Sequence, residues 1–535
     1  MVRVKAASRW GKVGSVTMAS RALVAALLLA AAATAAGAPE PYRCEARGGP
    51  PWREYRSAHF VADTDLAPAD ARQLVAQLEQ LHALELQALV GEVVEIPGRL
   101  RVVALRDPRQ FRELAGQEVR AYYRHAHGGP AVVLQSEGLR VAPEAVAHEL
   151  AHHLSRFLFP RQPAWFSEGL AQFVETAATP RRAEEAAVGS HIARAGAGAA
   201  GGRWVGLAPE AMAKAVRATP LVPAHSLLAW SGRIDHAVPT RFHLSSWLLY
   251  HYLWNKRSGE LSGYQRRLSD GESPAAAWLA AFPGYDPARP ETLAGLDAEL
   301  ERYRRGGRFT SYQVPLPEVQ VPVSERALGS AEVHVLLAGV RAGWPAPRAE
   351  AEALLAAELD EALREDPTNP IAIVQRARLG AGGPPPLAAL RASVAARPGD
   401  GWAWFTLASQ LRAPQEAKER EACYREAVAL EPDAASAQNS LAWLLVESGR
   451  AREALPFANR AVDLAPWDPV IIDTLAVVAG ELGQCPQALQ LARRAVEALP
   501  PEGERTSAVR RHLEDFQRRC GSPPASSAAP VPEHP

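Results

Sequence analysis

Two histidines and a glutamate have the spacing of a metal-dependent hydrolase. His148, Glu149 and His152 form an HExxH motif in segment 143–157, whose pattern predicts a helix beginning at Pro143. Residues four apart on a helix lie one above the other, with about 5–6 Å between Cβ atoms, so both imidazoles can converge on one ion. Glu149 is placed to take a proton from a metal-activated water and pass it to a leaving amine. The alternative is an ordinary helix that carries two unrelated histidines.

A third ligand is predicted sixteen residues after the second histidine. Glu168 lies in a second predicted helix, from near Pro163 to about Thr176, within Phe166-Ser167-Glu168-Gly169-Leu170-Ala171. An HExxH motif followed by aromatic-x-Glu-Gly-x-Ala resembles the gluzincin metallopeptidases, and most closely the peptidase MA-like group of bacterial exported proteins. The resemblance covers about residues 52–305 and implies an α+β zincin-like domain. It also implies a Zn²⁺ ion bound by three residues, with Glu149 as catalytic base: His148, His152 and Glu168. Such a set leaves one zinc position open for water.

The sequence departs from that family at two positions. Many relatives have an acidic residue four positions after the ligand glutamate, where this chain has Gln172. Gln172 can accept a hydrogen bond but brings no charge, and Glu175, about one turn further, is a candidate substitute. Relatives often have a tyrosine in a later helix, where this chain has His243. His243 could replace that tyrosine in stabilising an oxyanion, or could be a partly buried helix histidine.

Other polar residues near the motif are weaker candidates. His153 points about 100° away from its neighbour on the helix, so we expect it at the surface or behind the ligands. A predicted loop before strand 131–135 carries four residues that could line the cleft: Tyr122, Tyr123, His125 and His127. Strand 131–135 could itself be an edge to which an extended peptide adds, which is how the resemblance implies that substrate is held.

Strands and helices alternate around the motif, which fits an α+β domain. Hydrophobic patterns predict strands at 56–64, 100–105 and 131–135, and a helix at 70–89 in which Glu85 interrupts the apolar stripe. Residues 179–240 predict loops and short helices, and residues 241–306 predict further helices. The candidate peptidase domain therefore spans 50–310, with its zinc core at 50–178 and a helical part at 241–306. A Pro- and Val-rich stretch predicts an extended linker at 311–332.

The C-terminal third contains a 34-residue repeat. Prolines recur at this interval, at 398, 432, 466 and 500, and so do small residues at 427, 461 and 495. The period, the small residues and the closing proline resemble the tetratricopeptide repeat. We expect an all-α repeat solenoid at 345–519, closed by a capping helix at 506–519, which binds a protein partner on its concave face. Residues 520–535 are expected to be disordered.

The N-terminus predicts export. Residues 1–38 combine basic residues, an apolar run at 22–36 and the small residues Ala36-Gly37-Ala38, the pattern of a signal peptide. We expect a periplasmic or secreted protein, with membrane contact only if the signal stays uncleaved. Of the four cysteines, Cys485 and Cys520 are the best candidates for a disulfide, because both should lie near element ends. Cys423 is expected to be a buried thiol.

Charge excludes one class of function. The chain has 59 basic and 59 acidic residues, and five basic residues lie in 1–38, so the remainder has 54 against 59. It has no basic surplus for nucleic-acid binding. A GxGxxG match at 196–201 follows no predicted strand and is interpreted as chance.

The sequence predicts two alternative functions. The first is an exported zinc-dependent peptidase that acts on peptide or protein substrates and whose repeats recruit a partner. The alternative is an interaction protein whose repeats do the work, with the zinc fold as an inactive or weakly active platform.

Overall fold

The computed structural model describes most of the chain after the predicted signal. The described residues are 41–115, 121–126, 129–135, 143–179, 190–192, 202–230, 240–341, 348–380, 383–500 and 502–521. The signal segment, the GxGxxG match and nearly all of the predicted tail lie outside them. Within these ranges, no helix is both long enough and apolar enough to cross a membrane.

A six-stranded mixed sheet forms the centre of the N-terminal region. Its strand order is β4-β5-β3-β2-β1-β9, in which β2, β3 and β5 run parallel and the other pairs are antiparallel. The strand bounds are β1 Trp52–Arg56, β2 Phe60–Thr64, β3 Leu100–Leu105, β4 Ala121–Ala126, β5 Gly129–Gln135 and β9 Ser324–Leu328. The strand predicted at 56–64 is thus the second half of a hairpin.

Helices cover both faces of this sheet. One face packs against α2 (Pro68–Val90) and α5 (Pro143–Leu158) in the largest apolar core, which continues into α6 (Ala164–Val174). The other face packs against α3 (Pro108–Ala115) and α14 (Ser330–Arg341). The predicted helices at 70–89, 143–157 and 163–176 are confirmed within a few residues. The α+β architecture therefore places the HExxH helix directly on the sheet.

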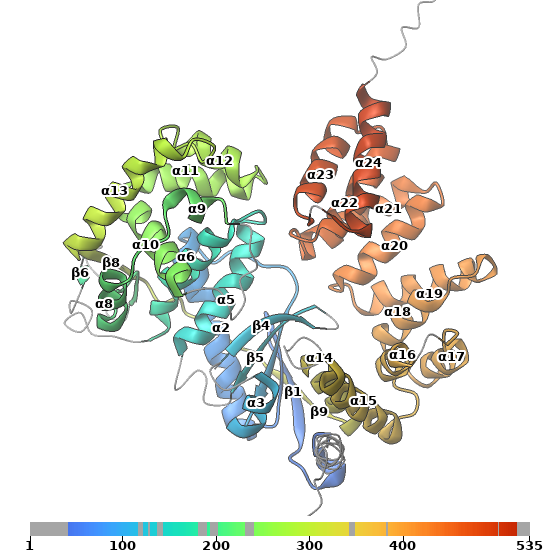
Figure 1. Cartoon of the computed structure of the whole chain (residues 1–535). Coiled ribbons are helices and arrows are strands. Elements are labelled where there is room, and N and C mark those ends of the chain that lie inside the picture. The colour runs from blue at the N-terminus through green and yellow to red at the C-terminus, as the bar shows by residue number, and fades with distance from the viewer. Residues whose placement is uncertain are drawn as a thin grey trace, which may run out of the picture.

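A second group of helices packs on the far side of α6. Figure 1 shows these helices together on one side of the sheet. Their bounds are α8 Glu210–Ala218, α9 Ala224–Leu228, α10 Thr240–Lys256, α11 Ser258–Ser269, α12 Pro274–Ala281 and α13 Pro290–Gly306. A small sheet lies among them, with strands β6 Ser190–Ile192, β7 Arg203–Val205 and β8 Phe309–Val314. Short 3₁₀ helices occur at Glu45–Arg47, Glu175–Ala178 and Pro414–Glu416.

The predicted linker at 311–332 contains ordered structure. It includes the end of β8, all of β9 and the start of α14. Strand β9 pairs antiparallel with β1, and Arg326 on β9 forms an ion pair with the buried Glu54 of β1. Four of the five residues of β9 are exposed, as is common at a sheet edge. The Pro- and Val-rich residues between β8 and β9 are what made this segment resemble a linker, although an ordered strand follows them directly.

The C-terminal third is an all-α repeat solenoid. Helices of successive repeats pack in antiparallel pairs and form an arc beside the sheet region in Figure 1. Their bounds are α15 Arg348–Glu365, α16 Pro370–Leu379, α17 Leu387–Ala396, α18 Gly401–Gln410, α19 Ala417–Leu430, α20 Ala435–Glu447, α21 Ala451–Leu464, α22 Pro469–Glu481, α23 Cys485–Glu497 and α24 Glu504–Gly521. The small residues at the 34-residue interval are fully buried between helices: Ala427, Ala461 and Ala495. The predicted repeat architecture and its closing helix are confirmed.

The cysteine predictions are also confirmed. Cys485 and Cys520 form a disulfide that ties the start of α23 to the end of α24. Cys423 is a free, buried thiol on α19, and Cys44 is likewise free and buried.

Candidate functional site

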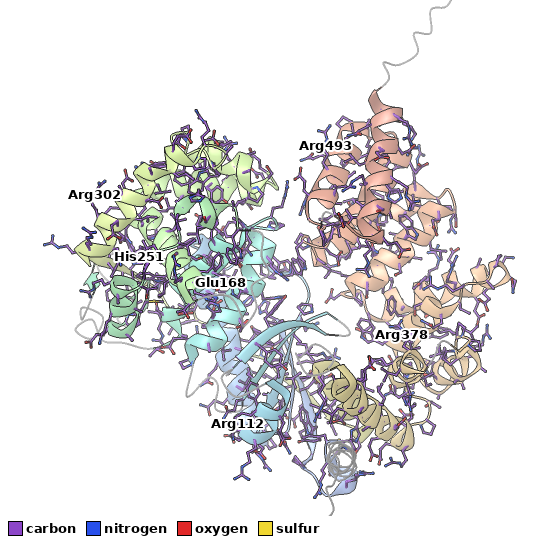
Figure 2. The ribbon with its side chains drawn as sticks, in the orientation of Figure 1. Arg112, Glu168, His251, Arg302, Arg378 and Arg493 are labelled. Carbon is purple, nitrogen blue, oxygen red and sulfur yellow. A yellow bond between two sulfur atoms is a disulfide. The ribbon has the colours of Figure 1, made fainter. Side chains whose placement is uncertain are left out.

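The three predicted ligands converge between α5 and α6. The Nε2 atoms of His148 and His152 are 3.0 Å apart. Glu168 Oε1 lies 3.2 Å from His152 Nε2, and Glu168 Oε2 lies 3.5 Å from His148 Nε2. Figure 2 shows Glu168 within the helical body, well apart from Arg378 and Arg493 on the repeats. The sequence spacing and the packing of α6 on α5 thus bring two imidazoles and one carboxylate to a single point.

This geometry fits a tetrahedral zinc ion. Two ligand atoms that each lie about 2.0–2.2 Å from a tetrahedral ion are about 3.3–3.6 Å apart, close to the spacings found here. Two facing imidazole nitrogens at 3.0 Å repel unless a cation or a proton lies between them. Glu168 is buried, and its Oε2 atom has no hydrogen-bond partner within the described structure. Each of these features would be satisfied by a cation.

The other nitrogen of each histidine is held by a neighbour. His148 Nδ1 lies 2.8 Å from Glu175 Oε2, and His152 Nδ1 lies 2.9 Å from Ser167 Oγ. Such contacts fix the ring orientation and direct each Nε2 atom towards the point where the three side chains converge. The suggested substitute role of Glu175 is therefore confirmed as a contact. Ser167 was not predicted, and its only sequence signal is its place directly before Glu168.

The two histidines favour the ionised form of Glu168. Burial alone would raise the pKa of Glu168, but the neighbouring His148 and His152 hold this pKa well below its usual range. Burial raises the pKa of Glu175, although its contact with His148 opposes this. Burial also raises the pKa of Glu85 on α2, which is fully enclosed and has no partner for either oxygen among the described residues. The interruption that Glu85 makes in the apolar stripe of the predicted helix at 70–89 thus marks a carboxylate that is buried in the fold.

Glu149 faces the open edge of the sheet. Its Oε2 atom accepts a hydrogen bond from the Tyr123 backbone N–H at 3.1 Å. Tyr123 is on β4, which pairs with β5 on one side only. The prediction that Tyr122, Tyr123 and His125 lie in a loop is therefore wrong, and so is the suggestion that strand 131–135 is the edge. The free edge of β4 borders the cluster, and strand addition there would place a peptide beside Glu149.

The later helix α10 brings His243 to the cluster. His243 Nε2 lies 3.5 Å from Glu168 Oε2, and burial lowers its pKa. Gln172 donates from Nε2 to the carbonyl oxygens of Glu168 and His243, so it acts as a donor and not as the expected acceptor. Gly169 permits this approach of α10, because a Cβ there would lie 2.5 Å from the Ser246 carbonyl oxygen. Gly169 is therefore needed for the helix crossing.

The remaining candidates are divided between two faces of the sheet. Tyr123 packs its ring against His153, with centroids 6.0 Å apart. Tyr122 points to the opposite face and packs near Phe111. His153 is buried and does not join the cluster, as expected for a residue that is no ligand. The side chain of His125 and the whole of His127 lie outside the described residues.

A second group of potential ligands is better explained as a structural anchor. Ligand atoms of His59, Glu79 and His82 lie within 4.8 Å of one another. The two imidazole rings are stacked, with centroids 4.0 Å and planes 17° apart. Because imidazole lone pairs lie in the ring plane, two nearly parallel rings do not converge on one ion. Glu79 instead accepts the His59 backbone N–H at 2.9 Å and ties the β1–β2 turn to α2.

A large groove lies between α5 and the repeats. We call it the repeat groove, and its volume is ≈ 1280 Å³. Aromatic side chains line it: Phe157, Trp402, Phe405, Tyr424, Trp443 and Trp467. Phe157 of α5 packs edge-on against Trp467 with ring centroids 4.8 Å apart, and Arg161 forms an ion pair with Glu497. The groove therefore has one wall made by the HExxH helix and its surroundings and another made by the repeats.

Comparison with known proteins gives matches only at the level of solved structures. No family model matches the chain, and no curated protein matches it. The TPR protein TTC0263 of Thermus thermophilus is similar at 17% identity and a TM-score of 0.25, over 35% of this chain and 97% of that one. Yeast Tom70 is similar at 12% identity and a TM-score of 0.29, over 58% and 69%. YrrB, a TPR protein described as having an unusual peptide-binding site, is similar at 15% identity and a TM-score of 0.25, over 35% and 92%. These scores are too low to bear on function.

Proposed function

We propose that the repeats of this chain bind a protein segment and that the same chain hydrolyses peptide bonds at a zinc centre. The binding half is supported by the repeat groove, whose volume exceeds the roughly 300–1,000 Å³ of small-molecule pockets. The hydrolytic half rests on one observation, the convergence of His148, His152 and Glu168 within 4.8 Å. The sheet region would accordingly be an α+β zincin-like domain.

The residues around the cluster suit peptide hydrolysis. Zinc bound there would supply Lewis acidity, polarising a peptide carbonyl and making a water molecule acidic enough to attack at neutral pH. Glu149, which accepts a hydrogen bond from β4, would accept the proton of that water and return it to the leaving amine. His243, close to Glu168, would stabilise negative charge on the carbonyl oxygen. The open edge of β4 would align the substrate backbone.

The second candidate is an interaction protein without hydrolytic activity. The aromatic repeat groove favours it directly, because a groove of this kind can bind a partner without any reaction. The unliganded Glu149 beside the cluster argues for hydrolysis, because a purely structural zinc site needs no such carboxylate. We also propose export to an oxidising compartment, on the signal-like segment 1–38 and the Cys485–Cys520 disulfide.

Metal analysis of the purified chain tests the hydrolytic half. We expect about one zinc per chain in the wild type and none in His148→Ala. A mixture of denatured proteins would then be incubated with the wild type and Glu149→Gln, and new N-termini would be identified by mass spectrometry. If the chain neither contains zinc nor takes it up, the peptidase proposal fails and the interaction function remains.

A further inference from the structure

The repeat groove carries an unbalanced charge. Nine charged side chains line it: Arg99, Arg412, Arg420, Arg505, Arg511, Asp433, Glu447, Asp468 and Asp473. Three of the carboxylates are already engaged. Asp433 pairs with Arg99 and Arg460, Asp468 accepts the backbone N–H groups that begin α22, and Asp473 lies 2.8 Å from His512 Nδ1. Glu447 and Asp468 are the described lining carboxylates that have no cationic partner, and Glu447 accepts no hydrogen bond either.

The arginines are far less neutralised. Four of them form no ion pair with any described residue: Arg412, Arg420, Arg505 and Arg511. Arg420 also buries its Nε atom without a hydrogen-bond partner. Asn439, on the same wall, has an Oδ1 atom that is likewise buried and unpartnered. Cationic and polar groups left open beside aromatic rings are suited to a partner that brings carboxylates and apolar side chains.

The groove borders the helix that carries two of the candidate metal ligands. His153 and Phe157 line it from α5, one and five residues after the predicted ligand His152, which does not itself line it. Pro130, at the start of β5, lines it as well and pairs with His125 on β4. The free edge of β4 then runs to Tyr123 and Glu149. A chain lying in the groove can continue along this edge only in an extended conformation, because strand addition requires it.

We propose that the repeat groove binds an extended acidic segment of the substrate and holds it so that adjoining residues lie along β4 and enter the metal centre. This rests on the proposed peptidase function. The repeats then select substrates at a distance from the cleaved bond, and short peptides that cannot span both sites are poor substrates.

The binding step is tested on the full chain carrying Glu149→Gln, which should bind substrate without cleaving it. The probe is a fluorescein-labelled peptide of about twelve residues that alternates glutamate with phenylalanine and proline, read by anisotropy. A matched peptide has lysine in place of glutamate. We expect the acidic peptide to bind at least about tenfold more tightly than the basic one, with an affinity that falls as salt is raised.

Charge reversal identifies the surface. Arg412→Glu with Arg505→Glu should weaken binding of the acidic peptide by at least about tenfold. The control makes the same change in charge at exposed arginines outside the groove, Arg452→Glu with Arg493→Glu, and should leave binding nearly unchanged. Equal binding of both peptides, or equal effects of both variants, would overturn the proposal. The proposal would also be overturned if the chain formed dimers through the groove that exclude the peptide, because the groove would then bind a second copy of this chain.

Delivery to the metal centre is tested by kinetics on the metal-loaded chain. A cleavable bond preceded or followed by the acidic segment is compared with the same bond in a short peptide. Arg412→Glu with Arg505→Glu should raise KM for the long substrate about tenfold, leave its kcat unchanged and leave the short substrate unaffected. An unchanged KM overturns delivery. If the wild type cleaves neither substrate, the peptidase function fails, while the anisotropy result still decides whether the groove takes an acidic segment.

Discussion

In the cluster of His148, His152 and Glu168, each histidine is held by its own partner, whereas in the repeats the same side chain returns every 34 residues. Glu175 holds His148 and Ser167 holds His152, and no second copy of either contact exists in the described cluster. Between the repeat helices, alanine fills the same position three times, at 427, 461 and 495, and is fully buried each time.

This difference determines how each region should respond to change. Stability in a repeat array is approximately a sum of similar local terms, so one substitution weakens its own repeat and its neighbours. A cluster of unique polar contacts has no such reserve, and its function depends on every member. We therefore expect sharp functional losses in the sheet region and graded, local losses in the repeats.

The largest effect is expected at the proposed catalytic base. Glu149→Gln keeps the side-chain shape but cannot accept a proton, so hydrolysis should fall by about 10²–10⁴-fold. Zinc content, measured by elemental analysis, and peptide binding in the repeat groove should not change. Full activity in this variant would remove Glu149 from the mechanism.

Loss of the disulfide should cause a large destabilisation that stays local to the end of the repeats. Cys485 and Cys520 are 35 residues apart in sequence, and a cross-link that closes such a loop stabilises by about 4 kcal/mol. In Cys485→Ser with Cys520→Ser, amide hydrogen exchange should speed up in α22–α24 and stay unchanged in α5 and α6. Equal acceleration in both regions would show that the repeats and the sheet region unfold as one unit, so that losses in the repeats are not local.

Gly169→Ala should destabilise the sheet region by about 3 kcal/mol. The new Cβ would lie 2.5 Å from the Ser246 carbonyl oxygen and 2.7 Å from Tyr250 Cβ, so α10 must move away from α6. The control is Gly263→Ala on α11, where a Cβ meets nothing within 4 Å and alanine should stabilise by up to ~1 kcal/mol. Urea unfolding compares the two; equal midpoints would show that the helix crossing tolerates a methyl group.

The contrast between the recurring contacts of the repeats and the unique contacts of the cluster also explains which features could be predicted from the sequence. The repeats were predictable because their signal recurs, and the HExxH helix because the motif is local and its apolar pattern is strong. Bringing Glu168 to the histidines depended on the family resemblance, since sixteen intervening residues do not by themselves fix a contact. Whether the three residues bind zinc stays a prediction.

Contacts between distant segments were not predictable in this way. Gln172 and His243 are 71 residues apart, and nothing local indicates that the Gln172 side chain meets the His243 carbonyl oxygen. Strand β4 was mistaken for a loop because it carries tyrosines and a histidine, residues that are common in loops. Strand β9 was mistaken for part of a linker because a Pro- and Val-rich stretch directly precedes it. In both cases the pairing partner, and not the strand itself, determines the structure.

Acidification should weaken the sheet region first. Burial alone would raise the pKa of Glu79, but hydrogen bonds from His59 and Ser57 lower it to about 2. Because the folded pKa lies below the unfolded one, near 4.5, this stabilisation is present above pH 4.5 and is lost as pH falls towards 2. It amounts to at most roughly 3 kcal/mol. Urea unfolding at pH 7 and pH 3 should show a smaller difference in Glu79→Gln than in the wild type.

The repeats should show a smaller dependence of opposite sign. The hydrogen bond with Asp473 raises the pKa of His512, which ties α24 to α22, while partial burial opposes that rise. A raised folded pKa means that the stabilisation is complete below the unfolded value, about 6.5, and is lost as pH rises through the folded value. His512 is partly exposed, so solvent screens the pair and the effect should be the smallest of the five. Amide exchange in α24 should therefore be more protected at pH 5.5 than at pH 8, after correction for the intrinsic rate. His512→Gln should abolish this difference, whereas an unchanged difference would mean that another group in the last repeat titrates.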